Sequence, residues 1–526
     1  MKLLFKTIII FLSLSACTFV NGQDNESADF VVAPSHKEVR VVPGVPTTFT
    51  ISVKNRTGRD ADFAIGVEDL ENVSDKFSLK SYISLATPNI RLSNNERFDL
   101  SITVLIPVFM GTGFYGAVTI ATDTGGVGGS GVAHLSSRIA VPIFVRPAAE
   151  VDLSGRLVNF TLASGRGVLT KSPVNFIITY ENTGDYHIAP VGKIILKNIF
   201  GQTISVDDIS PWFILPHSER STTVEVGRGE MFGKYNAEII VSEGMSKNIQ
   251  SRELTFWVLP WKLLFFAIGS LVVILFLIKI RRSYLMFLVF GLLIFSARTT
   301  YATVASSTNY ILERDSINFA GGRSTSTNYI DEDTVGESAT GRATSTNFAL
   351  EAGYQQSDGY ISITSPADVT LSPAIASLGG GAANASAPWT VKTDNPSGYT
   401  LYIKAATSPA LKSSGGSFGD YTPTSGIPDF TWSVSSASSE FGFSPSGSDI
   451  ATRYKDSGTS CSTGSLDTSS SCWDGLSTTN KIISNTTSAN QSGSLTTVYF
   501  KAEAGSATTQ SIGSYSALIT VTATAL

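Results

Sequence analysis

The sequence has little of the chemistry on which most enzymes and nucleic-acid-binding proteins depend. Charged residues make up 15% of the 526 residues, and the net charge is −5. Without a basic surplus to neutralise phosphates, we expect no nucleic-acid partner. The four histidines and three cysteines are scattered without a recurring metal-ligand spacing, so we expect neither a metal site nor a cofactor.

The few motifs that resemble catalytic ones lack the context that catalysis requires. A single Gly-x-Ser-x-Gly match centres on Ser417 in a Ser/Gly-rich loop, and no histidine occurs after residue 357. The neighbouring carboxylates Glu68 and Asp69, like Asp207 and Asp208, would point to opposite faces of a strand. The sequence therefore predicts no catalytic residue and a protein that is not an enzyme.

The N-terminus is typical of a secreted protein. Lys2 and Lys6 precede a short apolar stretch at residues 8–14, which indicates a signal peptide over residues 1–22. Cleavage after Gly22 fits the small residues before that position. The tetrapeptide Leu14-Ser15-Ala16-Cys17 instead fits a bacterial lipobox, which would leave a lipidated Cys17. Both routes remain open.

A second hydrophobic stretch, at residues 261–280, predicts a transmembrane helix. Its core at 263–278 contains 16 consecutive uncharged residues, and Trp257 and Trp261 stand where an interfacial aromatic belt is expected. Lys279, Arg281 and Arg282 follow it. The positive-inside rule therefore assigns the preceding residues to the outside of the cell.

A further apolar segment, at residues 284–302, has two interpretations. It is either a short return span, or an internal signal sequence with a cleavage site at Ala302. In both cases the residues from about 303 onward lie outside the cell. Two exported halves, each behind its own signal-like segment, also allow an origin in two fused genes.

The region between the signal peptide and the predicted transmembrane helix is expected to form two immunoglobulin-like β-sandwiches, at residues 29–148 and 150–258. Apolar and polar residues alternate in stretches such as 48–53, 115–121 and 138–145, with turn signals about every ten residues. With no cysteine pair, the first sandwich must depend on its hydrophobic core. The strand at 254–258 leads directly towards the predicted membrane helix.

The order of these segments resembles that of the WxL-interacting proteins of Gram-positive cell surfaces. The resemblance covers about residues 29–282 and implies a peptidoglycan-binding module followed by a host-protein-binding module. No binding residue is carried over. The matching residues are Val42-Pro43-Gly44, Ile90-Arg91-Leu92, Gly113-Phe114-Tyr115-Gly116-Ala117-Val118, Asn182-Thr183-Gly184, Ile199-Phe200-Gly201 and Ile214-Leu215-Pro216.

A 19-residue repeat occupies residues 303–356. Ser307-Thr308-Asn309-Tyr310 recurs as Ser326-Thr327-Asn328-Tyr329 and as Ser345-Thr346-Asn347-Phe348. A fixed period indicates stacked structural units. We expect each unit to form a short strand or hairpin.

Residues 357–526 predict a third β-rich, sandwich-like domain, with strands that include 388–391, 430–434 and 515–521. The domain is weakly similar to WxL-type surface domains, but its tripeptides Trp389-Thr390-Val391 and Trp432-Ser433-Val434 have Val in place of Leu. We interpret these tryptophans as core residues. In an exported domain, Cys461 and Cys472 are expected to form a disulfide.

These features together predict an all-β, non-enzymatic protein integral to a bacterial cell membrane, with both exported parts on the extracellular side. One hypothesis is adhesion to peptidoglycan, a glycan or a protein. The alternative is an assembly or anchoring factor, in which the N-terminal half holds the C-terminal domain or other surface proteins at the wall.

Overall fold

We describe the protein from a computed structural model. The structure describes residues 28–259 and 359–525, apart from 71–72, 109–110, 123–130, 150, 152, 228–230 and 244–248. It also describes Gly269 and short strands between residues 306 and 352.

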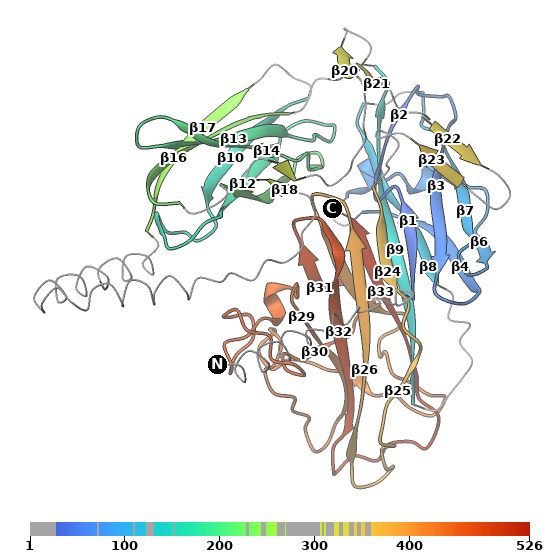
Figure 1. The fold of residues 1–526 in the computed structure, drawn as a ribbon. Helices are drawn as coiled ribbons and strands as arrows, with labels where there is room; N and C mark the ends of the chain where they lie inside the picture. Colours follow the sequence, from blue (N-terminus) through green and yellow to red (C-terminus); the bar gives the residue numbers. More distant parts are fainter. Residues whose placement is uncertain are drawn as a thin grey trace, which may run out of the picture.

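The architecture consists of two large mixed sheets that run through two domains, with a separate sandwich beside them (Figure 1). One sheet has the strand order β28-β29-β32-β26-β24-β1-β3-β7-β5, with β30 paired to β29. The other has the order β31-β27-β33-β9-β8-β4-β6, with β2 and β25 paired to β9. Both sheets combine strands of the first sandwich with strands of the C-terminal domain.

The first sandwich covers the N-terminal part of the described chain. Its strands are β1 Asp29–Ala33, β2 Lys37–Val41, β3 Thr47–Arg56, β4 Ala61–Glu68, β5 Ile83–Leu85, β6 Asn89–Leu92, β7 Arg97–Val104, β8 Phe114–Thr122 and β9 Val132–Pro147. Two short 3-10 helices, Asp75–Phe77 and Lys80–Tyr82, precede β5.

The second sandwich packs a three-stranded sheet, β10-β12-β15, on a five-stranded sheet, β11-β17-β16-β13-β14. Its strands are β10 Gly155–Leu162, β11 Val168–Leu169, β12 Val174–Asn182, β13 Val191–Asn198, β14 Thr203–Ile209, β15 Glu219–Val226, β16 Gly233–Ser242 and β17 Gln250–Val258.

The C-terminal domain follows three short hairpins. Its strands are β24 Ile361–Thr364, β25 Val369–Thr370, β26 Gly381–Thr393, β27 Tyr399–Ala405, β28 Gly419–Asp420, β29 Ser439–Gly447, β30 Asp474–Gly475, β31 Lys481–Thr486, β32 Asn490–Ala504 and β33 Ser516–Ala525. A 3-10 helix, Thr452–Tyr454, lies between β29 and β30.

The buried apolar residues fall into two clusters. One cluster is continuous through the first sandwich and the C-terminal domain, from Phe30 and Ile51 to Trp389 and Ile519. The other belongs to the second sandwich alone and includes Tyr180 and Trp212. The first sandwich and the C-terminal domain therefore share one core, whereas the second sandwich has its own.

The expected all-β fold and the immunoglobulin-like sandwiches are confirmed. Two strand assignments differ from expectation. The strand predicted at 138–145 is β9, which begins six residues earlier, at Val132. Residues 430–434 form no strand, because Trp432 stacks on Tyr421 with ring centroids 4.2 Å apart instead of joining a ladder.

The 19-residue repeat coincides with a recurring pair of antiparallel strands. The pairs are β18 Ser306–Ser307 with β19 Tyr310–Ile311, β20 Ala320–Thr325 with β21 Ile330–Val335, and β22 Gly341–Thr344 with β23 Ala349–Ala352. The pairs Ser306↔Ile311, Thr325↔Ile330 and Thr344↔Ala349 are in equivalent register. Each repeat therefore contains one pair of short antiparallel strands at the same position relative to its motif.

No helix among the described residues is long and apolar enough to cross a membrane. The span predicted at 261–280, Gly269 aside, and the apolar segment at 284–302 lie outside the described residues. Both remain predictions.

Candidate strand-donation site

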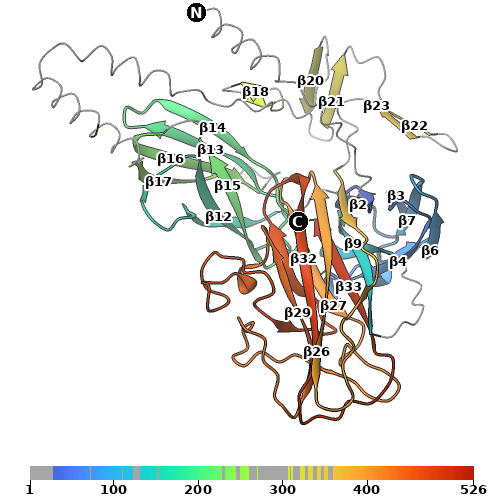
Figure 2. The ribbon, with the colours of Figure 1, turned by 60° about the horizontal axis from the view of Figure 1, so that its bottom comes forward.

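Strand β9 belongs to both domains that share the core. Its first half pairs in parallel with β33, from Val132↔Ser516 to Ala140↔Thr524. At its start, the other edge of β9 pairs with β25. Its second half pairs with β8 on one edge and with β2 on the other. Figures 1 and 2 show β9 extending from the first sandwich along the C-terminal domain beside β33.

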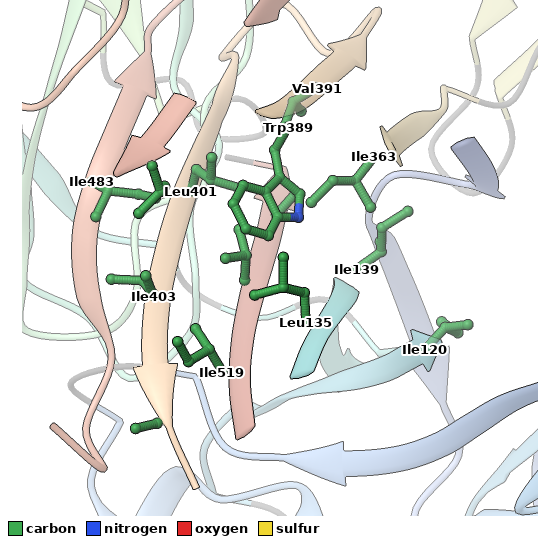
Figure 3. Packing of buried hydrophobic residues seen from close by; sticks show 14 of the residues in the cluster. Ile120, Leu135, Ile139, Ile363, Trp389, Val391, Leu401, Ile403, Ile483 and Ile519 are labelled. Atoms are coloured by element: carbon green, nitrogen blue, oxygen red, sulfur yellow. The ribbon is translucent and has the colours of Figure 1, made fainter. Parts of the chain in front are cut away.

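Side chains on one face of β9 fill the shared core, because alternate residues of a strand point to the same face. Ala133 and Leu135 are buried among residues of the C-terminal domain, whereas Val141 to Val145 belong to the part paired with β8. In Figure 3, Leu135 and Ile139 lie close to Trp389 and Ile363. The first half of β9 thus completes the core of a domain that lies more than 200 residues later in the chain.

A polar residue interrupts this apolar face of β9. Ser137 is buried, and its hydroxyl donates a hydrogen bond of 2.8 Å to the carbonyl oxygen of Thr364. The same hydroxyl oxygen accepts a hydrogen bond of 3.0 Å from Nε1 of Trp389. Both partners lie in the C-terminal domain, so the one polar group on this face is satisfied across the domain boundary.

The opposite face of β9 makes charged contacts with the C-terminal domain. Nδ1 of His134 lies 2.7 Å from Oδ2 of Asp368, whose Oδ1 accepts a 2.8 Å hydrogen bond from the backbone N–H of Leu135. The Arg138 guanidinium donates to Thr522 Oγ1 at 2.8 Å and to Glu68 Oε1 at 2.5 Å. Asp368 therefore fixes the start of β9, and Arg138 bridges the two domains.

The second sheet contains a matching junction. Strand β1 pairs antiparallel with β24, from Asp29↔Thr364 to Val32↔Ile361. The backbone N–H of Ser365 also donates a 2.9 Å hydrogen bond to the carbonyl oxygen of Ala28. We call the β9–β33 and β1–β24 pairings together the seam.

The second sandwich contacts the first sandwich through a group of aromatic residues. His187 is buried beneath Tyr115, Phe144 and Phe213, with ring centroids 5.3–5.7 Å apart. Its backbone N–H donates a 2.8 Å hydrogen bond to the Tyr115 hydroxyl, and its Nε2 lies 4.0 Å from Glu38 Oε1. This group of aromatic residues forms the contact between the two sandwiches.

Burial controls the ionisation of this contact. Burial lowers the pKa of His187 and outweighs the neighbouring Glu38 carboxylate, which raises it. Burial also raises the pKa of Glu38, but His187 and Arg146 outweigh this effect and lower that pKa to about 2. At neutral pH the contact therefore holds a neutral imidazole beside an ionised carboxylate and a guanidinium.

The seam consists of elements of the kind that bind a polypeptide. Its main elements are backbone ladders and apolar side chains, which is the arrangement of β-strand addition: main-chain hydrogen bonds supply affinity and alternate side chains supply specificity. Within the described residues, no group of three or more His, Cys, Asp or Glu side chains is placed to hold a metal ion.

Two of the described residues that the sequence singled out contact the seam: Trp389 donates to Ser137, and Glu68 accepts from Arg138. Cys461 and Cys472 form a disulfide in the C-terminal domain, with an S–S distance of 2.00 Å. Trp389 is a buried core residue at the seam, as interpreted, but Trp432 is only partly buried and donates to Glu503. Cys17, Gly22 and Ala302 lie outside the described residues.

The first six residues of β9, 132–137, were not predicted as a strand. The segment at 132–137 contains Ala, His and two Ser residues after a glycine-rich stretch, so its alternation is weak. The sequence nonetheless contains a pattern that extends the strand predicted from 138 towards its N-terminus. Apolar residues occupy odd-numbered positions on both sides of residue 138, as in Ala133, Leu135, Ile139, Val141 and Ile143.

No protein-family model matches the chain. No curated protein matches it either, so the resemblance to WxL-interacting proteins remains a prediction.

Several solved structures are similar to part of the chain. The CupB2 chaperone of Pseudomonas aeruginosa is 12% identical, covers 43% of this chain and 99% of its own, and has a TM-score of 0.23. The E. coli chaperone DraB is 16% identical, covers 42% and 96%, and has a TM-score of 0.24. The complex of the Salmonella enterica SafA pilin with the SafB chaperone is 15% identical, covers 43% and 96%, and has a TM-score of 0.25. At these values the likeness assigns neither a family nor a function.

Proposed function

We propose that residues 29–258 act as a non-enzymatic assembly factor that holds the C-terminal domain by donating a strand to it. The observation that carries this proposal is the parallel pairing of β9 with β33, with Leu135 buried in the C-terminal core. Of the two hypotheses from the sequence, this geometry favours the assembly factor. Adhesion to peptidoglycan or another envelope ligand remains a prediction.

The parallel pairing supports donation rather than ordinary folding of one sandwich. Strands joined by short turns pair antiparallel, whereas a parallel partner needs a long connection. Here the connection includes the whole second sandwich and residues 260–358. The first half of β9 therefore reaches the C-terminal domain as an added strand.

Strand donation would also protect the C-terminal domain. Without β9, one edge of β33 would present unpaired N–H and C=O groups, which is the kind of edge that templates aggregation. The space filled by Leu135 would be open beside Trp389, since both residues belong to the shared core. Holding this edge covered is what an assembly factor must do before the domain reaches its final place.

The predicted topology fits this role. Both exported halves would lie on the same side of the membrane, and cleavage at Ala302 would leave the C-terminal part bound only through the seam. The N-terminal half would then anchor a separate surface protein without a covalent bond.

The test is to cut the connection and measure what remains joined. A protease site is inserted at residues 353–358 of the full chain, and the purified protein is cleaved to give the nicked protein. We expect the two halves of the nicked protein to elute together. Leu135→Ala should then speed their separation about 30-fold or more, because deleting a buried leucine side chain costs ~2–5 kcal/mol.

Ile143→Ala is the matched control. Ile143 lies on the same face of β9, but it pairs with Gly116 of β8 and Lys37 of β2 inside the first sandwich. It should leave the separation rate of the halves unchanged. Immediate separation of the unsubstituted halves, or equal effects of both substitutions, would refute strand donation.

A further inference from the structure

The second sandwich has one end that faces away from both other domains. Its near end makes the contacts already described, together with a hydrogen bond from Gly113 N–H to the carbonyl oxygen of Asp185 and one from Ser397 Oγ to that of Pro211. The opposite end, here called the distal end, contains the β13–β14 turn, the start of β16, the end of β17 and strand β11. The pairs Asn198↔Tyr235, Gly233↔Val258 and Val168↔Trp257 place these segments at one level.

Exposed apolar side chains line this end across the full width of the five-stranded sheet. Phe200 is 84% exposed, and Ile199 and Phe232 are each 65% exposed. Val168, Trp257 and Leu259 are also exposed large hydrophobic residues. We call these six residues, Val168, Ile199, Phe200, Phe232, Trp257 and Leu259, the apolar rim.

The outer face of the same sheet carries polar contacts on its middle strands, where Lys197 Nζ lies 2.8 Å from Glu238 Oε2 and Asn236 donates a 3.0 Å hydrogen bond to Glu253. On the edge strand β14 this face also has the exposed apolar residues Ile204 and Val206. Isolated exposed hydrophobic residues are normal on a protein surface, but apolar residues gathered at one end mark an interaction site. The apolar rim is such a site.

Charge at the distal end is mostly positive. In the described part of this end, Arg166, Lys171 and Lys234 are exposed, and Glu225 is the exposed carboxylate. Lys234 is directly opposite Trp257 in the ladder. Tryptophan, lysine and arginine favour a membrane interface, where an apolar body and a polar or cationic tip are both satisfied. Phenylalanine beside them adds apolar surface that can be buried in the lipid boundary.

The position of the rim in the chain indicates the partner. Leu259 is the last described residue before the predicted span, whose uncharged core begins only four residues later, at Leu263. If that segment crosses a bilayer, four residues of chain reach at most about 14 Å. The distal end must then lie against the lipid surface.

We propose that the second sandwich rests on the bilayer through its distal end, with the apolar rim in the interfacial layer of an anionic lipid membrane. This surface holds the near end, and with it the seam, away from the membrane. The inference goes beyond strand donation and does not depend on it.

The test measures the depth of single labels on the full chain in vesicles of phosphatidylcholine and phosphatidylglycerol. Cys461 and Cys472 are joined in the disulfide and Cys17 is replaced by serine, so an environment-sensitive fluorophore attaches only to an introduced cysteine. The test positions are Phe200→Cys and Phe232→Cys. The control is Ile249→Cys, because Ile249 is also an exposed apolar residue, 71% exposed, but stands at the near end just before β17.

We expect nitroxide-bearing lipids to quench the labels at 200 and 232 several-fold more than the label at 249, and aqueous iodide to show the reverse order. Equal lipid quenching at all three positions would overturn the proposal. Labels at 200 and 232 shielded from both quenchers would also overturn it, because a protein surface such as a second copy would then cover the rim. Two independent test positions guard against a local effect of either substitution.

Discussion

The indole N–H of Trp389 donates a hydrogen bond of 3.0 Å to the hydroxyl of Ser137, 252 residues earlier in the chain. Both residues are buried in a core formed by two domains. Ser137 lies on the half of β9 that pairs with β33, and Trp389 lies on β26. This hydrogen bond therefore joins β9 to the core of the C-terminal domain.

Ser137→Ala should weaken the seam. The substitution leaves the buried N–H of Trp389 without its acceptor, and an unsatisfied buried donor costs ~1–3 kcal/mol. This cost corresponds to an association constant of the two halves of the nicked protein that is about 5- to 150-fold lower. Ser136→Ala is the control, since the Ser136 hydroxyl donates to the carbonyl oxygen of Thr122 within the first sandwich. Association that is unchanged by Ser137→Ala would contradict the prediction.

Asp368→Ala should loosen the start of β9. The Asp368 carboxylate accepts the backbone N–H of Leu135 and lies 2.7 Å from the His134 ring, so its removal leaves two groups without a partner. We expect the Leu135 amide to exchange its hydrogen about 5- to 150-fold faster, which corresponds to a local loss of ~1–3 kcal/mol. Mass spectrometry of exchange across residues 131–140 measures this effect. Asp368→Asn keeps an acceptor oxygen and should restore most of the protection; identical exchange in both variants would count against the contact.

Reduction of the disulfide should destabilise the C-terminal domain selectively. Cys461 and Cys472 close a short loop, with a sequence separation of 11, and such a cross-link is worth ~2–3 kcal/mol in the chain-entropy account. The double substitution Cys461→Ser/Cys472→Ser should lower the melting temperature of the C-terminal domain and leave that of the second sandwich unchanged. Calorimetry resolves this difference, and an unaltered melting profile would argue against a structural role for the bond.

Acidification should weaken the contact between the two sandwiches. The ring of His36 also belongs to this contact, with its centroid 5.1 Å from that of Phe213. Burial lowers the pKa of His187 and of His36, so below pH 6.5 the unfolded chain binds more protons than the folded one. The stability that depends on these two neutral histidines is therefore fully present above pH 6.5 and falls as the pH drops below 6.5. The contribution of Glu38 to stability has a different pH range. The pKa of Glu38, about 2, lies below the usual 4.5, so the stability that the ionised carboxylate contributes is lost only as the pH falls from 4.5 towards 2.

Unfolding in urea between pH 7.5 and pH 5 isolates the histidine contribution. His187→Phe replaces the imidazole within the same aromatic group and should flatten part of this pH dependence. A variant with the same pH dependence as the unsubstituted protein would show that His187 does not control the contact.

Much of the fold follows from local sequence patterns. Period-two alternation predicts strands such as β3, β8 and β16, and the turn signals between them indicate the sandwiches. A strand with one buried face shows this alternation wherever its partner lies. The disulfide between Cys461 and Cys472 could also be predicted from the sequence, because these cysteines are close together in the sequence of an exported domain.

The strand expected at 430–434 is absent for a physical reason. Alternation around Trp432 also suits an aromatic residue that packs on a surface, and Trp432 stacks on Tyr421 with its indole N–H bonded to Glu503. Local pattern alone does not distinguish a ladder residue from a surface aromatic residue.

The sequence by itself determined most of the strands, the second sandwich, the disulfide partners and the apolar segments, since each depends on neighbouring residues. Only the tertiary structure decided that β9 begins at Val132 and pairs with β33, and that two expected domains share one core. The edge that accepts β9 is formed by residues far along the chain, as in the contact of Arg138 with Thr522 across 384 positions. Strand pairing is set by main-chain groups that nearly all residues share, so the identity of the partner strand is not encoded in any local pattern.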